Sequence, residues 1–201
     1  MTQLTTDTAA SVQQGPSGPL SGVAGLPEPG SYEIDPSHSE VGFVTRHLMV
    51  TKVRGHFTSF SGTIAVADTP EQSAVEVTID PSSIETRDAK RDTHLRAADF
   101  FDTENHPVIS FRSTRVEFAG GERLRVTGDL TILGQSRPVT LEGTYDGAFT
   151  DPWGGSRIAF EARTEINRED WGLNWNVALE SGGVLVGKKV QLELTVEAVK
   201  Q

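Results

Sequence analysis

A group of basic side chains near the middle of the chain is the clearest candidate for binding chemistry. Arg87 and Arg91 are four positions apart, which places them on one face of a helix, and His94 follows three positions after Arg91. Guanidinium groups form bidentate hydrogen bonds to the oxygens of a phosphate or another polar head group. We therefore predict that Arg87, Arg91 and His94 contact a polar head group. The alternative is a solvated helix whose basic groups pair with Asp88 and Asp92.

The histidines do not form a metal-binding motif. They stand at positions 38, 47, 56, 94 and 106, with no HExxH and no close His-x-His spacing, and the chain has no cysteine. We expect no metal site and no cofactor. His38 follows Asp35-Pro36-Ser37 and is expected to fix a turn through hydrogen bonds. His47, at the end of a predicted strand, is either a polar point at the mouth of a cavity or a buried, hydrogen-bonded histidine.

Catalytic motifs are absent from the sequence. It contains no nucleophile elbow, P-loop or dinucleotide-binding fingerprint. Asp99, Asp102 and Glu104 are close in sequence, but nothing in the pattern pairs them across a cleft. We expect no catalytic residues and a protein that is not an enzyme. An enzyme built from scattered polar residues at the rim of the fold is the alternative.

Composition narrows the possible partners and location. The net charge of −10 argues against a nucleic-acid partner, which would need clustered positive charge, and no apolar run is long enough to span a membrane. Residues 1–30 are rich in Gly and Pro and contain no Lys or Arg, which predicts a disordered tail. Because this segment lacks the basic start and the apolar run of a secretory signal, we expect a cytoplasmic protein.

The elements that must position these residues are strands. Apolar and polar residues alternate over 75–80, 124–132, 139–145, 158–166 and 190–198, and more weakly over 40–47, 53–67 and 107–118. Such a run has one apolar face and one polar face, which is typical of antiparallel strands. Closing eight such strands removes their long unpaired edges. The sequence predicts an all-β fold over residues 31–201, an eight-stranded antiparallel up-and-down barrel.

Two segments interrupt the alternation. Residues 87–98 contain helix formers without Gly or Pro, and predict a short helix between the third and fourth strands, with Thr86 as its cap. Residues 167–183 predict a long loop or short helix before the eighth strand, beside one mouth of the barrel. Its Trp171 and Trp175 either cover the barrel and contact a ligand or plug one barrel end.

The inward faces suggest a hollow interior. Gly128, Gly143, Ala162 and Ala198 share these faces and would leave space along the barrel axis. A linear chain could occupy that space, because each five-carbon isoprene unit contributes roughly 4 kcal/mol before ordering costs. A barrel filled by its own side chains is the alternative. The side chains predicted to point inward are Val41, Phe43, Phe57, Ile64, Val75, Val77, Ile79, Leu130, Ile132, Val139, Leu141 and Leu192.

Several spaced blocks resemble the YceI-like proteins, and together they cover about Tyr32 to Lys200. The blocks are Tyr32–Ser39, Thr86–Asp88, Phe100–Asp102, Arg168–Trp175 and Gly183–Gly187. The resemblance implies a lipocalin-like eight-stranded barrel that binds a long apolar molecule without catalysis. Polyisoprenoids, isoprenoid quinones, prenyl phosphates and fatty-acid derivatives are the ligand classes that it suggests. It also suggests a homodimer.

Our main hypothesis is a carrier or sequestering protein that buries an isoprenoid-like lipid in the barrel lumen. Fatty-acid or fatty-amide binding, an enzyme with a polar site at the barrel rim, and an interaction module with a filled barrel are the alternatives. The predicted ligand-binding residues are Val41, Phe43, His47, Phe57, Val77, Ile79, Arg87, Arg91, His94, Leu130, Ile132, Leu141 and Trp175.

Overall fold

The protein consists mainly of long antiparallel strands, in a computed structural model that describes residues 27–48, 50–178 and 183–201. The predicted tail lies largely outside these residues, and the first strand begins at Gly30. In chain order the elements are β1 (Gly30–Ile34), β2 (Glu40–His47), β3 (Thr51–Phe57), β4 (Phe60–Val66), η1 (Pro70–Gln72), β5 (Ala74–Ile79), η2 (Pro81–Ser83), β6 (Ile84–Glu85), α1 (Ala89–Arg96), β7 (Ile109–Phe118), β8 (Arg123–Ile132), β9 (Gln135–Thr150), β10 (Ser156–Asn167), η3 (Arg168–Trp171) and β11 (Val186–Lys200).

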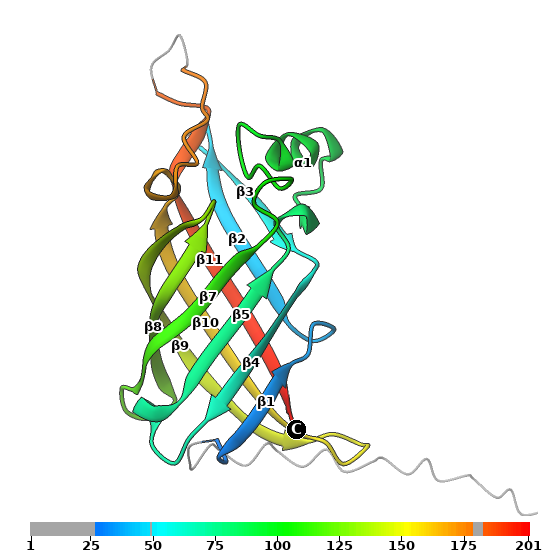
Figure 1. The fold of residues 1–201 in the computed structure, drawn as a ribbon, viewed down its shortest axis with the longest axis vertical. Helices are drawn as coiled ribbons and strands as arrows, with labels where there is room; N and C mark the ends of the chain where they lie inside the picture. The colour runs from blue at the N-terminus through cyan, green and yellow to red at the C-terminus, as the bar shows by residue number, and fades with distance from the viewer. Residues whose placement is uncertain (1–26, 49, 179–182) are drawn as a thin grey trace, which may run out of the picture.

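The strands close into the predicted eight-stranded antiparallel barrel (Figure 1). The ring runs β1-β4-β5-β7-β8-β9-β10-β11, and pairing of β1 with β11 closes it. The remaining strands extend the wall from the other part of β11. β2 pairs with β11, β3 pairs with β2, and the short β6 pairs with β3. The sequence pattern did not indicate β1, although this strand closes the ring.

The short helix is confirmed, with different bounds and a different cap. It spans residues 89–96 rather than 87–98, and Asp88 caps it by accepting hydrogen bonds from the first-turn N–H groups. Thr86 is buried and instead donates its N–H and its hydroxyl to the Asp92 carboxylate. Arg96 donates to two backbone carbonyls at η2 and β6, at 2.6 and 2.8 Å. These bonds hold α1 at one end of the barrel (Figure 1).

Strand β8 shows how the alternation builds the interior. Leu124, Val126, Leu130 and Ile132 are buried, while Arg123 and Asp129 between and beside them are exposed. A strand exposes alternate side chains on opposite faces, so one face of β8 lines the barrel and the other meets water. Within the described residues, no helix has the length and apolar character needed to cross a bilayer.

Candidate functional site

The barrel encloses a cavity of about 570 Å³, within the range of small-molecule sites. At the end away from α1, its wall includes Pro27, Val66 and Pro70. At the α1 end, its wall includes His94 and Trp175. The cavity therefore extends along the barrel between η1 and α1, the two ends visible in Figure 1.

The structure brings together every predicted ligand-binding residue except Arg87. Arg87 is exposed, has a φ of 64°, and lies outside the cavity wall. Its backbone turns at the position before the Asp88 cap, and the position of Arg87 in the structure gives no support to the predicted head-group contact, which stays a prediction. The residues found on the wall are Val41, Phe43, His47, Phe57, Val77, Ile79, Arg91, His94, Leu130, Ile132, Leu141 and Trp175.

The small inward residues have a different role from the predicted one. Of the four, only Ala162 lies on the cavity wall. A Cβ on Gly128 would lie 2.6 Å from Cζ of Phe111, and one on Gly143 would lie 2.1 Å from the Glu161 carbonyl oxygen. These two glycines admit a neighbouring ring and a neighbouring strand, and neither lies on the cavity wall.

The two loop tryptophans have separate roles. Trp171 is 3% exposed, and its indole Nε1 donates to the Leu130 carbonyl at 2.9 Å. Trp171 therefore packs in the buried core and does not lie on the cavity wall. Trp175 lies on the cavity wall, and its ring centroid is 4.4 Å from that of His94, in an edge-to-face arrangement. His94 Nε2 is 3.0 Å from a carboxylate oxygen of Asp99, which fixes the imidazole beside the cavity.

Arg168 lies on the cavity wall and was not among the predicted ligand-binding residues. Its side chain donates to the carbonyls of Gly187 and Leu173, and its Cζ lies 5.9 Å from the ring centroid of Phe100. The residue is only 2% exposed, and its Nη2 has no hydrogen-bond partner among the described residues. Burial lowers the pKa of the Arg168 guanidinium, which still stays protonated at neutral pH. No sequence periodicity in this irregular segment indicates an inward side chain.

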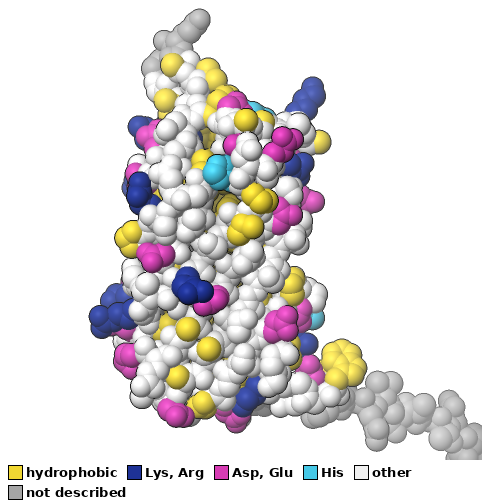
Figure 2. Space-filling view, viewed as in Figure 1, with side chains coloured by type: hydrophobic (Ala, Val, Ile, Leu, Met, Phe, Trp, Pro, Cys, Tyr) yellow, Lys and Arg dark blue, Asp and Glu magenta, His cyan; other side chains and the backbone are white. Residues whose placement is uncertain are grey.

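The ionisable groups on the cavity wall are all basic. The chain as a whole carries a net charge of −10, yet no Asp or Glu occurs on the wall formed by the described residues. Figure 2 shows acidic and basic side chains scattered together over the face of the barrel that it draws. An apolar tunnel with a basic end is suited to an elongated molecule with a polar or negatively charged head. The basic wall residues are Arg46, His47, Lys90, Arg91, His94 and Arg168.

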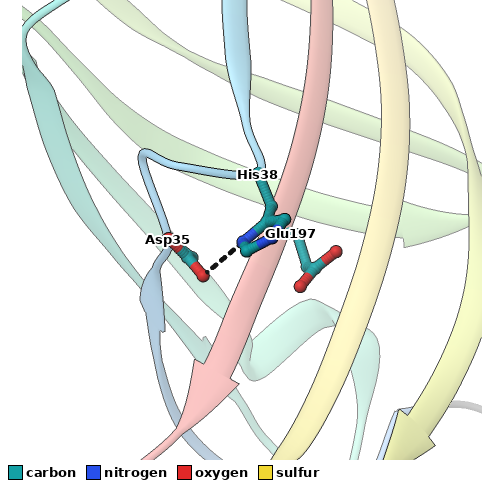
Figure 3. Close-up of side chains that lie close together, drawn as sticks. All are labelled: Asp35, His38 and Glu197. Carbon is teal, nitrogen blue, oxygen red and sulfur yellow. Dashed lines mark hydrogen bonds and ion pairs between the residues drawn. The ribbon is translucent and has the colours of Figure 1, made fainter. Parts of the chain in front are cut away.

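A second polar cluster lies where β1 turns into β2. Ligand atoms of Asp35, His38 and Glu197 lie within 4.8 Å of one another (Figure 3). His38 Nδ1 is 2.8 Å from the Asp35 carboxylate, which confirms the predicted role of this histidine in fixing a turn. Hydrogen bonds from Ser37, Arg157 and His38 hold the pKa of the Asp35 carboxyl well below its usual range.

Arg157 gives this second cluster a structural role. Its guanidinium donates to Asp35 at 2.7 Å, to Asp151 at 2.8 Å and to Glu197 at 2.5 Å. One cation thus already pairs with both carboxylates, Asp35 and Glu197, that a divalent metal ion would need. The cluster ties β1, β10, β11 and the turn between β9 and β10 to one another.

Comparison with known proteins places this architecture in a family. The YceI-like domain matches residues 32–198. Protein YceI of Escherichia coli O157:H7 is 38% identical over 181 residues, which cover 89% of this chain and 91% of the relative.

Solved structures show the same fold. BcnA of Burkholderia cenocepacia superposes with a TM-score of 0.72 at 24% identity, covering 82% of this chain and 98% of BcnA. A polyisoprenoid-binding domain from Saccharophagus degradans, implicated in plant cell wall breakdown, superposes with a TM-score of 0.64 at 18% identity. The superposition covers 85% of this chain and 98% of that domain. At these identities the two structures support the fold alone. The domain match and the Escherichia coli relative show that this chain belongs to the YceI-like family.

Proposed function

We propose that the protein binds a long apolar lipid of the polyisoprenoid class in its barrel cavity, and carries or sequesters it. The observation that carries the proposal is the cavity of about 570 Å³ that extends along the barrel behind an almost entirely apolar wall. The polyisoprenoid-binding description of the Saccharophagus degradans domain supports this ligand class. Membership of the YceI-like family supports a binding role for the barrel.

The wall chemistry supplies the driving force for binding. Aliphatic side chains such as Val77, Leu141 and Leu192 line the cavity together with the rings of Phe43 and Phe111. Burial of each isoprene unit contributes roughly 4 kcal/mol before the chain loses its freedom, at about 0.8 kcal/mol per carbon. A fatty acid or fatty amide would gain from the same wall, and it is the second candidate class. The basic α1 end supports placing the polar head beside Arg91 and His94.

Analysis of co-purified lipid tests the proposal directly. The protein is purified without detergent, extracted with organic solvent, and the extract is analysed by mass spectrometry. We expect an isoprenoid at close to one molecule per barrel. Repeated absence of any lipid would refute a carrier role, and a fatty acid or amide in its place would replace the polyisoprenoid with the second class. A Thr78→Trp variant, altered on the outer face of β5, is the matched control and should carry the same lipid.

Three further parts of the proposal have their own tests. We propose that the protein acts without catalysis, resides in the cytoplasm and forms a homodimer. Recovery of the bound lipid chemically unchanged after prolonged incubation would support the first point, and conversion to a product would refute it. Cell fractionation measures the location, and light scattering on the purified protein measures the mass of the assembly.

A further inference from the structure

Arg168 carries a buried charge that makes no direct ion pair with a carboxylate of the described residues. The guanidinium is 2% exposed, its hydrogen bonds within the described residues go to neutral carbonyls, and Nη2 has no partner there. A buried charge is costly unless it is paired, and an unmade hydrogen bond adds to the cost. The residue lies on the cavity wall, so a bound molecule is the available source of a counter-charge.

The neighbouring groups leave that position open to an anion. The adjacent carboxylate, Glu169, lies outside the cavity wall and is 2.8 Å from Nζ of Lys188. Its charge favours the protonated Arg168 from a distance, but burial has the larger effect and lowers the Arg168 pKa. The wall around this end of the barrel adds Lys90, Arg91 and His94, and the described part of the wall includes no acidic residue. An anionic head group would therefore meet favourable charge and no carboxylate repulsion on the wall.

We propose that the lipid bound by this protein carries an oxyanion head, a carboxylate or a phosphate, and that Nη2 of Arg168 donates a hydrogen bond to it inside the cavity. The inference rests on the proposed function, because it assigns the head group of the lipid that fills the barrel. Nη2 is closed to water in the free protein. The head group reaches it by displacing the Phe100 ring, whose centroid lies 5.9 Å from Cζ of Arg168.

A purely structural role for Arg168 makes different predictions. In that case the guanidinium only holds the carbonyls of Gly187 and Leu173, and the Phe100 face supplies the remaining stabilisation. The charge of the ligand head would then have no effect on affinity that depends on Arg168. Three probes with the same fifteen-carbon chain separate the two roles: farnesol, farnesoic acid and farnesyl monophosphate.

Isothermal titration of the full chain with each probe, below its micelle concentration, measures the effect of the head group. We expect one or both acids to bind wild-type protein at least tenfold more tightly than farnesol, which corresponds to about 1.4 kcal/mol. Arg168→Gln should bring the favoured acid to within about threefold of farnesol. Arg163→Gln removes the same charge from the exposed outer face of β10 and should keep the preference. The favoured acid distinguishes a carboxylate head from a phosphate head.

The outcomes separate the two proposals. Equal binding of the three probes by wild-type protein overturns the head-group inference and leaves the lipid-binding proposal intact. An undiminished acid preference in folded Arg168→Gln also overturns it, because another group then holds the anion. Failure of every probe to bind, in protein freed of lipid, counts against isoprenoid binding itself.

A structure of the wild-type complex keeps the inference testable if Arg168→Gln does not fold. Crystals grown with the favoured acid should show a head-group oxygen within hydrogen-bonding distance of Nη2 of Arg168, and a displaced Phe100 ring. A head group at the η1 end of the cavity, or in solvent, would overturn the inference.

Discussion

A bulky side chain at the middle of β5 should divide the cavity. Val77 lies on the cavity wall, half-buried, and pairs with Gly62 on one side and Phe111 on the other. The interior of an eight-stranded barrel is only wide enough for side chains or one slender ligand, so an indole at this position should block the passage of a chain. We therefore expect Val77→Trp to shorten the longest ligand that the protein accommodates.

The expected effect follows from the cost and gain per isoprene unit. Each unit gains roughly 4 kcal/mol from burial. Fixing its three rotatable single bonds costs roughly 2.6 kcal/mol, at about 0.9 kcal/mol each, so the expected net gain is about 1.4 kcal/mol, or tenfold. Geranylgeraniol has two units more than geraniol, so the wild-type protein should bind it about a hundredfold more tightly. In Val77→Trp this ratio should fall to about threefold or less.

Thr78→Trp provides the matched control. Thr78 is the next residue on β5 and is exposed, so the same indole is added on the outer face of the same strand. Titration calorimetry with both alcohols measures the ratio, and circular dichroism on heating measures stability. Overpacking in Val77→Trp should cost about 1–3 kcal/mol, or roughly 2–12 °C in Tm. If Val77→Trp keeps the hundredfold ratio while Thr78→Trp also keeps it, the ligand does not pass position 77 and the cavity assignment is wrong.

The remaining predictions concern stability. Arg157→Met should lower Tm by several degrees at neutral pH, because it removes the cation between three carboxylates; an unchanged Tm would show that the cluster contributes nothing. The pKa values of Asp35 and Asp151 are lowered in the folded protein, so the stabilisation from these groups is present above about pH 4 and is lost as the pH falls below it. Urea titrations at several pH values should show this loss in wild-type protein and a weaker one in Arg157→Met; parallel pH profiles would contradict the assignment. Asp92→Ala leaves the N–H and the hydroxyl of Thr86 without their acceptor. It should lower the free energy of unfolding by about 2 kcal/mol, or Tm by roughly 4–8 °C, in differential scanning calorimetry. A shift below one degree would show that α1 does not depend on this carboxylate.

The sequence alone determined the barrel and much of its lining. In β8, the alternation of Leu124, Val126, Leu130 and Ile132 with polar residues identifies the inward face. The side chains of a strand alternate with a period of two, so local sequence decides which residues share a face. The closed ring follows from the number and length of the strands, because open edges of that length are unfavourable. The wall residues from Val41 to Leu192 could therefore be predicted without coordinates.

Only the tertiary structure decided the polar end of the cavity. Arg168 and Arg87 both lie in irregular backbone, where no period relates sequence position to direction. Arg168 points inward because η3, β11 and the Leu173 segment place carbonyls around it, and Arg87 points outward because the chain turns before the helix cap. The strand β1 was missed for a different reason: its five residues are too few to show a clear alternation, and its place in the ring comes from pairing with β4 and β11. Side-chain direction is a local property within a strand, whereas outside regular structure it depends on contacts between segments that are distant in sequence.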